Sequence, residues 1–426
     1  MAHDPGVRVL NGGGLNSSPK VVGLIQASNE WPLLALSISH ALMHHVDEVY
    51  VLNHSSTDGS CEGTRRLQEL WPDRIRVFDY ADEHFWQEAC LSVLIELSRD
   101  ASPDWIYVFD ADEFMITRDG GSLKEVLKIV HPEYPVVRYE VENWVSTADF
   151  DESDLACYRL LRYRSTPSLS LDMSIETRVD EIRNGNVNYF DLPFASKAVF
   201  RNNEALWISA GAHRQKVLPE SRQLEMRSDG LRVVHLPLLS RGRLVRRATT
   251  GRLEVQDRFP AGHGWQNQMI WVFSQEGRLD EFWANHSIAA GSSSEDRTPP
   301  SFVVDDGFVR AIEPVLRFLE DGLESKTLRR RAEQDLPSPD LVDSRIPFRT
   351  AVHLSRRLQV VADSMREERE ALIGLRDTSR GVSAPARVVG RLSRRARGKA
   401  GRLVGSVASC LTRLHGRRSD ETGKEQ

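Results

Sequence analysis

The stretch "DWIYVFDADEF" (104–114) joins an apolar strand to a group of carboxylates, and it decides the fold. Residues 106–109 have the continuous apolar character of a strand that is buried on both faces. Asp110, Asp112 and Glu113 follow at once. Because like charges this close repel one another, we expect something positive to lie beside them.

Before this stretch, short apolar runs alternate with helical stretches of ten to fifteen residues. Such an alternation is typical of right-handed βαβ units around a parallel sheet. We therefore expect an α/β fold, Rossmann-like, with a mostly parallel central sheet and flanking helices. The expected strands are 21–27, 48–53, 75–80 and 105–111, and the expected helices run from 30 to 45, up to 70, and from 84 to 98.

After residue 120 the alternation becomes irregular. Further strands are expected at 134–145, 196–202 and 231–238, and helices at 305–323 and 350–375. The chain is expected to divide into a flexible leader (1–20), an α/β domain (21–290), a helical extension (300–376) and a basic tail (380–426).

The composition is that of an ordinary globular protein. Of 426 residues, 40% are hydrophobic and 27% charged, and the net charge is −5. The four cysteines form no C-x-x-C pair, which argues against a zinc ribbon or a disulfide framework. No signal peptide and no apolar run of about 18–20 residues is seen. We expect a soluble, cytoplasmic protein.

The tail from Arg380 to Arg418 holds eleven Lys or Arg residues and no Asp or Glu. Within it, Leu403, Val407 and Leu411 recur at helical spacing, which is compatible with a basic amphipathic helix on the anionic inner face of a membrane. Alternatively, the tail is disordered or binds nucleic acid without specificity.

Asp110 and Asp112 lie on alternate residues at a strand end, where two carboxylates can share Mg²⁺ or Mn²⁺. The alternative is a solvated acidic loop. A D-x-D pair also serves the haloacid-dehalogenase-like phosphatases, but there it follows the first strand, with Thr or Val two residues later. Here Phe114 occupies that place and three βα units precede the pair, so that class is excluded.

Polar clusters also follow the first two expected strands, "QASNE" (26–30) and "NHSSTDGS" (53–60). Ligands of parallel sheets bind beyond the carboxyl ends of the strands. Asn29, Glu30 and Asp58 could therefore contact a nucleotide, or they could cap the helices that follow.

"QASNEWPLLALSISHALMHHVDEVYVLNHSSTDGS", "WQEA" and "DWIYVFDADEF" together resemble a family 2-like glycosyltransferase of the GT-A fold, in the subgroup with a D-x-D-E-F signature. The resemblance spans residues 21–120 and extends to about 290. It implies a hexosyltransferase-type enzyme with a nucleotide-diphosphate-sugar donor, Mn²⁺ or Mg²⁺, and inversion at the anomeric carbon. It also implies a saccharide or lipid-linked acceptor, as in the biosynthesis of cell-surface polysaccharides.

Carried over residue by residue, the resemblance makes Asp110 and Asp112 the metal-binding pair, with Asp112 the direct ligand. Glu113 would orient the loop or a donor-sugar hydroxyl. Many members carry Asp where this chain has Asn53, so base recognition would differ. The residues that would line the nucleotide cleft are Asn29, Glu30, Asn53, Asp58 and Gln87.

In the second half, His213 and His235 stand at strand ends where this family supplies a late histidine to the metal or the diphosphate. Lys197 and Arg214 would contact the diphosphate. "AGHGWQNQ" (261–268) would close over the site as a flap.

Inversion needs a base for the acceptor hydroxyl. Four acids cluster at 149–154, and Asp151 is the candidate. Two other functions stay open. A nucleotidyltransferase would want a Gly-rich basic loop after the first strand, which "QASNEWPL" lacks. A degenerate, non-catalytic sugar-binding module or scaffold would have no need for the carboxylate pair and His235.

Overall fold

The structure is a computed structural model that describes residues 18–81, 86–170, 172–203, 206–215, 224–250, 264–289, 302–323, 352–353 and 355–356. The strands are β1 (Val21–Ala27), β2 (Glu48–His54), β3 (Ile75–Tyr80), β4 (Trp105–Phe109), β5 (Glu113–Thr117), β6 (Val136–Val145), β7 (Tyr163–Ser165), β8 (Lys197–Arg201), β9 (Glu225–His235) and β10 (Phe302–Val304). The α-helices are α1 (Leu33–His44), α2 (Ser60–Leu70), α3 (Gln87–Ser98), α4 (Leu123–Lys128), α5 (Ile175–Arg183), α6 (Arg241–Thr250), α8 (Trp265–Gln275), α9 (Leu279–His286) and α10 (Gly307–Gly322). Short 3-10 helices are η1 (Arg99–Ala101), η2 (Leu155–Leu160), η3 (Tyr189–Asp191) and η4 (Ala210–Ala212).

The strands form one mixed sheet with the order β10-β7-β6-β8-β4-β1-β2-β3, and β9 joins β6 to β5. The half built from β1 to β4 is parallel throughout. Beyond β4 the sheet continues with β8, which runs antiparallel to β4 and to β6. β9 then lies parallel to β6 and antiparallel to β5.

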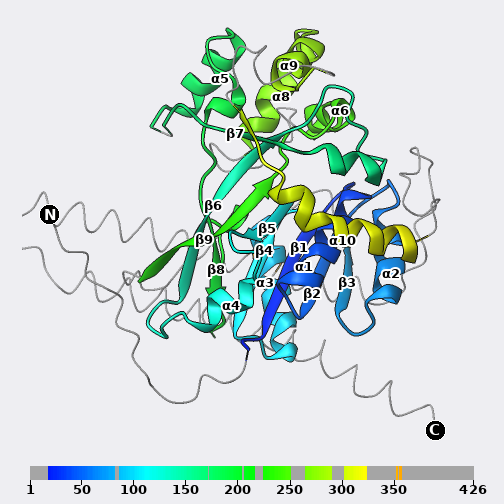
Figure 1. Cartoon of the computed structure of the whole chain (residues 1–426), viewed down its shortest axis with the longest axis vertical. Coiled ribbons are helices and arrows are strands. Elements are labelled where there is room, and N and C mark those ends of the chain that lie inside the picture. The colour runs from blue at the N-terminus through cyan, green and yellow to red at the C-terminus, as the bar shows by residue number, and fades with distance from the viewer. Residues whose placement is uncertain are drawn as a thin grey trace, which may run out of the picture.

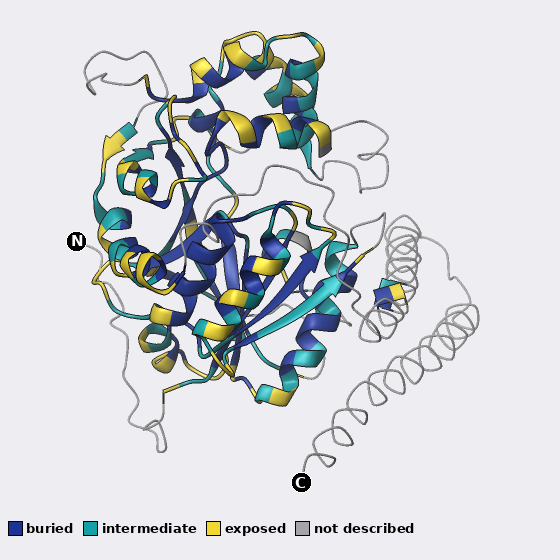
Figure 2. Ribbon diagram, turned by 90° about the vertical axis from the view of Figure 1, so that its right-hand side faces the viewer, coloured by how far each residue is buried: buried dark blue, intermediate teal, exposed yellow. Residues whose placement is uncertain are grey.

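The two faces of the parallel half carry separate apolar clusters, because successive side chains of a strand point to opposite faces. Val21 and Ile25 of β1 belong to the cluster under α1 and α10. Val22 and Leu24 belong to the cluster under α3. β1, β2 and β4 are buried on both faces, as Figure 2 shows in dark blue, which explains their mostly apolar sequence.

Helices α5, α6, α8 and α9, here called the helical cap, gather at one end of the sheet in Figure 1. They share a third apolar cluster that includes Leu244, Met269 and Phe282. α10 packs against α1 with a strongly apolar face and so covers the first cluster. The cap thus brings residues of the second half of the chain to the strand ends of the first half.

The expected α/β architecture, with a central sheet and flanking helices, is confirmed, and it is consistent with a GT-A-like arrangement. The expected fourth strand ends at Phe109, two residues early, because a turn over Asp110–Asp112 leads directly into β5. β5 and the four helices of the cap were not expected from the sequence. The proposed domain limits stay a prediction.

Several expectations fall outside the described residues, among them the basic tail and nearly all of the leader. The expected flap (261–268) lies partly outside them, and its described part, from Trp265, begins helix α8. Of the expected helix at 350–375, only four residues are described, and they are helical. None of the described helices combines the length and apolar character needed to cross a membrane.

Candidate functional site

Asp112 and His235 meet through the pairing of two strands. β5 begins at Glu113, and in its antiparallel register with β9 this residue lies opposite His235. The N–H of Leu236 donates to the carbonyl of Asp112 at 2.9 Å, which fixes the turn against the end of β9. The His235 Nε2 therefore lies 4.0 Å from the Asp112 Oδ2, although the residues are far apart in sequence.

The other ring nitrogen of His235 is held by Asn143, its register partner on β6, with 2.7 Å between Nδ1 and Oδ1. Burial lowers the pKa of His235 to about 4, so the ring is neutral at pH 7. With Nδ1–H donating to the Asn143 carbonyl, the lone pair of Nε2 faces the Asp112 carboxylate. Two such groups repel each other unless a cation lies between them. Metal-binding histidines typically donate their other ring N–H to a carbonyl or carboxylate oxygen, as His235 does to Asn143.

Asp112 and His235 thus fit a divalent cation as a pair of ligands. No group of three or more His, Cys, Asp or Glu side chains is arranged to hold a metal ion anywhere in the described residues, this pair included. His213 does not join this pair: its Nδ1 lies 3.0 Å from the carbonyl oxygen of Ser196, and its side chain lines the cavity described below. Among the described residues, Asp112 and His235 are therefore the two side chains that could hold a metal ion at this point.

Asp110 lies in a separate ion cluster with Lys197 and Glu113. The Lys197 Nζ is 2.8 Å from the Asp110 Oδ2 and 2.6 Å from the Glu113 Oε1. The Lys197 and Glu113 side chains are each 1% exposed. Burial alone would lower the pKa of Lys197, but the charges of Asp110 and Glu113 outweigh it and raise that pKa. Lys197, expected to contact a diphosphate, is the positive group that was expected beside the carboxylate stretch.

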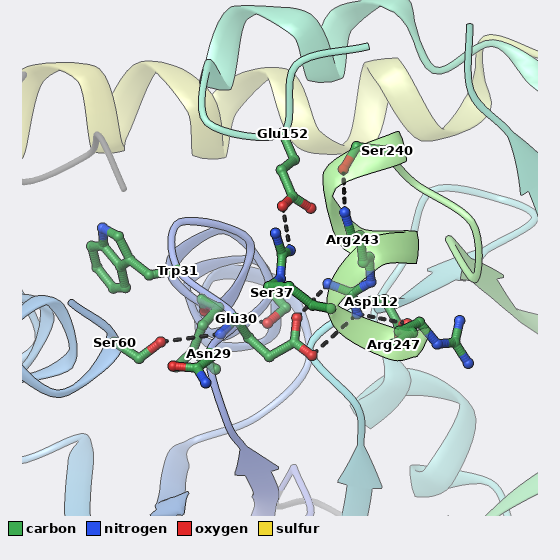
Figure 3. Close-up of polar contacts among 12 residues, drawn as sticks. Asn29, Glu30, Trp31, Ser37, Ser60, Asp112, Glu152, Ser240, Arg243 and Arg247 are labelled. Atoms are coloured by element: carbon green, nitrogen blue, oxygen red, sulfur yellow. Dashed lines mark hydrogen bonds and ion pairs between the residues drawn. The ribbon is translucent and has the colours of Figure 1, made fainter. Parts of the chain in front are cut away.

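Arg243 of α6 lies between Glu30 and Asp112 (Figure 3). Its Nη2 donates to the Asp112 Oδ2 at 3.1 Å and to the Glu30 Oε1 at 3.2 Å, and its Nη1 pairs with the other Glu30 oxygen. Burial would raise the pKa of Asp112, but the charge of Arg243 outweighs it, and the pKa is lowered. The second aspartate of D-x-D is therefore ionised and already paired.

Two more arginines lie on the same helix at positions that face the strand ends. Residues three and four apart share a helix face, so Arg243, Arg246 and Arg247 of "RGRLVRR" (241–247) line up. Arg246 pairs with Glu152, and the Arg247 Nε donates to the Asn267 Oδ1 at 2.8 Å. The residues that sequence reasoning missed are these three arginines and Asn143; the spacing in "RGRLVRR" was a usable signal for the arginines.

The loop at 149–154 turns its acids in different directions. Asp151 is exposed, and its Oδ1 accepts from the backbone N–H and hydroxyl of Ser153 at 2.9 and 2.7 Å. Its neighbour Glu152 is buried and faces α6. The acid of this loop that lies at the site is thus Glu152, whereas the sequence favoured Asp151.

Asn29 and Asp58 join the loops that follow β1 and β2. The Asn29 Oδ1 accepts from the Thr57 N–H at 2.7 Å, and the Asp58 Oδ2 accepts from the Trp31 N–H at 3.1 Å. Both residues therefore join the two loops to each other and cap neither α1 nor α2, whose N-termini have no side-chain cap. Asn53 is buried, and its Nδ2 donates to the Asp79 Oδ1 at 2.8 Å.

A cavity of about 360 Å³ opens beside His235, a volume within the range of small-molecule sites. Asn143 lines it and holds His235, and the Phe194 ring lines it at 4.4 Å from the His235 ring centroid. Its lining combines aromatic and polar side chains. The other polar and aromatic lining residues are Gln87, Arg178, Tyr189, His213, Trp265 and Gln266.

No protein-family model and no curated protein sequence matches this chain. Solved structures show weak similarity. A mannosyltransferase from Pyrobaculum calidifontis in complex with GDP-Man and Mn²⁺ is 14% identical, with 72% of this chain and 83% of that chain covered and a TM-score of 0.31. TarS from S. aureus is 11% identical, with 73% and 89% covered and a TM-score of 0.26. A mycobacterial protein is 14% identical, with 30% and 43% covered and a TM-score of 0.21. Similarities at this level carry no functional argument of their own.

Proposed function

We propose that this chain is a glycosyltransferase that moves a sugar from a nucleotide-diphosphate donor to a saccharide or lipid-linked acceptor, with a divalent metal ion and with inversion. The observation that carries the proposal is the pairing of Asp112 with a neutral, Asn143-oriented His235 at the strand ends, beside a cavity lined by polar and aromatic groups.

Asp112 and His235 would hold Mn²⁺ or Mg²⁺. When bound, such an ion neutralises a diphosphate and eases its departure as a leaving group. Asn143 keeps the His235 ring oriented, and Lys197 keeps the turn at Asp110 and Glu113 in place. The cavity beside His235 would bind the sugar. Its aromatic rings would pack against the apolar face of the sugar, and its planar polar groups would hydrogen-bond to the sugar hydroxyls.

The base for the acceptor hydroxyl is assigned to the loop at 149–154. The sequence pointed to Asp151; we favour Glu152, since it is buried at the site and held by Arg246. A base must come within hydrogen-bond reach of the proton that it removes. Replacing each residue separately by Gln or Asn, and measuring kcat, separates the two assignments.

The test is thermal stability with UDP, GDP, ADP and CDP, each with and without Mn²⁺. A ligand at one hundred times its dissociation constant adds about 2.7 kcal/mol to the free energy of unfolding. We expect one nucleotide to stabilise the protein only with Mn²⁺, and Asp112→Asn to lose this effect. Asp229→Asn, an exposed position on the same strand as His235, should retain it. If no nucleotide stabilises the protein with Mn²⁺, the transferase proposal fails and a non-catalytic binding role takes its place.

A further inference from the structure

Arg243 is hydrogen-bonded to the Asp112 carboxylate, which the proposed metal ion would need as a ligand. Its Nη2 donates to the Asp112 Oδ2 at 3.1 Å, and the His235 Nε2 faces that same oxygen at 4.0 Å. The Arg243 side chain is only 8% exposed. The Asp112 Oδ2 is therefore already bound by the Arg243 guanidinium, although a metal ion held together with His235 would bind the same oxygen.

The charges around Arg243 are balanced without any ligand. Glu30 and Asp112 accept from Arg243, and Glu152 is paired with Arg246 beside them. Arg247 lies close enough to lower the pKa of Asp112, so three arginines face three carboxylates. A divalent ion added at Asp112 would lie next to a buried guanidinium, and like charges in such a place repel strongly. Metal alone is therefore disfavoured.

A diphosphate changes this balance. It brings further negative charge and oxygen ligands, and a guanidinium binds phosphate oxygens through two parallel N–H groups, as it binds Glu30 here. The protein offers Asp112 and His235 as a pair, so the remaining metal ligands must come from elsewhere. A donor diphosphate would supply them and would also compete with Asp112 for Arg243.

We infer that Arg243 makes metal binding conditional on the donor: it neutralises Asp112 and Glu30 in the donor-free protein and turns to the diphosphate when the donor arrives. The inference rests on the proposed function and adds a positioning residue to it. Metal and diphosphate then bind with positive coupling, and each raises the affinity of the other by the same factor.

The test measures Mn²⁺ binding by the loss of the free-ion EPR signal, with and without the nucleoside diphosphate that stabilises the protein. We expect the wild type to bind Mn²⁺ at least roughly tenfold more tightly with the nucleotide present, within the usual range of such couplings. Arg243→Gln should bind Mn²⁺ more tightly than the wild type without nucleotide, because Asp112 is released, and its coupling should fall towards one.

Matched variants keep the test interpretable. Arg241→Gln changes an exposed arginine of the same helix that pairs with Asp280, and it should behave as the wild type. Arg243→Gln combined with Glu30→Gln removes one carboxylate along with the guanidinium, so that the fold is kept if the single variant is unstable. Arg243→Lys retains the charge without the two-pronged contact and should show intermediate coupling.

Two outcomes separate the inference from the proposed function. If the wild type shows metal–nucleotide coupling and folded Arg243 variants show the same coupling, Arg243 has no such role, while the transferase proposal stands. If neither Mn²⁺ nor any nucleotide binds the wild type, both fall together.

Discussion

Two ion clusters, each centred on a buried cation, flank the end of β4, and they differ in what holds them. In the first, Lys197 lies between Asp110 and Glu113, with its position set by adjacent strands of one sheet. In the second, Arg243 reaches from the helical cap to Asp112 and Glu30. The first cluster is part of the sheet, whereas the second joins two separate parts of the chain.

The partners also differ in exposure. In the first cluster Asp110 is 43% exposed, but Glu113 is 1% exposed and has no access to a solution ligand, whereas in the second cluster the side chains of Asp112 and Glu30 are 14% and 23% exposed. A buried pair stabilises little in itself, but breaking one leaves a costly unpaired charge. We therefore expect the Lys197 cluster to be required for folding and the Arg243 cluster to be available for ligand exchange.

The largest expected effect is that of Lys197→Met, which leaves Glu113 buried without a cation. We expect the free energy of unfolding to fall by about 3–5 kcal/mol, measured by urea denaturation. Lys124→Met, which breaks the partly exposed pair with Asp47, should cost less than about 1 kcal/mol. Adding Glu113→Gln to Lys197→Met should restore part of the loss. Equal losses for the two lysine variants would remove the distinction between the clusters.

Arg243→Gln should cost less than Lys197→Met, about 2 kcal/mol, because water can reach Asp112 and Glu30. The same denaturation experiment with saturating nucleotide and Mn²⁺ sharpens the comparison. The ligands should stabilise the Lys197 variant as they do the wild type, but the Arg243 variant less. A loss at Arg243 that matches the loss at Lys197 would show that both clusters are structural.

Acid should act through the buried histidines, and His45 is one whose contacts are all made by the neutral ring. Its Nε2 lies 2.7 Å from the Met115 carbonyl oxygen, and its Nδ1 accepts from the Leu123 N–H at 3.2 Å, so both nitrogens are used in the neutral form. Burial lowers its pKa to about 3. The unfolded chain then binds more protons below about pH 6.5, and the free energy of unfolding falls as the pH falls.

By pH 5 this loss should be about 2 kcal/mol for His45. The measurement is urea denaturation between pH 7 and pH 5, with His45→Gln as the comparison, since the Gln amide can both donate and accept. The slope with pH should be shallower in the variant. An unchanged slope would assign the acid sensitivity to other groups.

The smallest but most specific expected effect on metal binding is that of Asn143→Ala. Without the carbonyl that accepts from His235 Nδ1–H, the ring loses its orientation, and Mn²⁺ affinity with nucleotide should fall roughly tenfold or more. Asn186→Ala, at an exposed position, is the control for EPR titration. If Mn²⁺ binds the Asn143 variant as it binds the wild type, His235 is not a ligand.

The sequence predicted β1 to β4 almost residue by residue, because buried parallel strands and their helices carry local patterns. It did not predict the partners of the carboxylates. Lys197 was expected to contact a diphosphate, and no feature of the sequence around it indicates that its partners are Asp110 and Glu113. Arg243 was missed because arginines on one helix face resemble a solvated surface. Only the register of β5, β6 and β9 brings Asp112, Asn143 and His235 together.

The insertion of β8 between β4 and β6 has a consequence for biosynthesis. β4 leaves the ribosome long before its neighbour β8 (Lys197–Arg201) has been made. At a translation rate of roughly 5–20 residues per second, β4 has one unpaired edge for several seconds. During this time Glu113 also lacks its partner Lys197. Nascent chains at this stage present an edge that invites pairing with other chains. Slower translation between residues 110 and 197 should therefore increase aggregation or chaperone dependence, whereas slower translation after residue 240 should not.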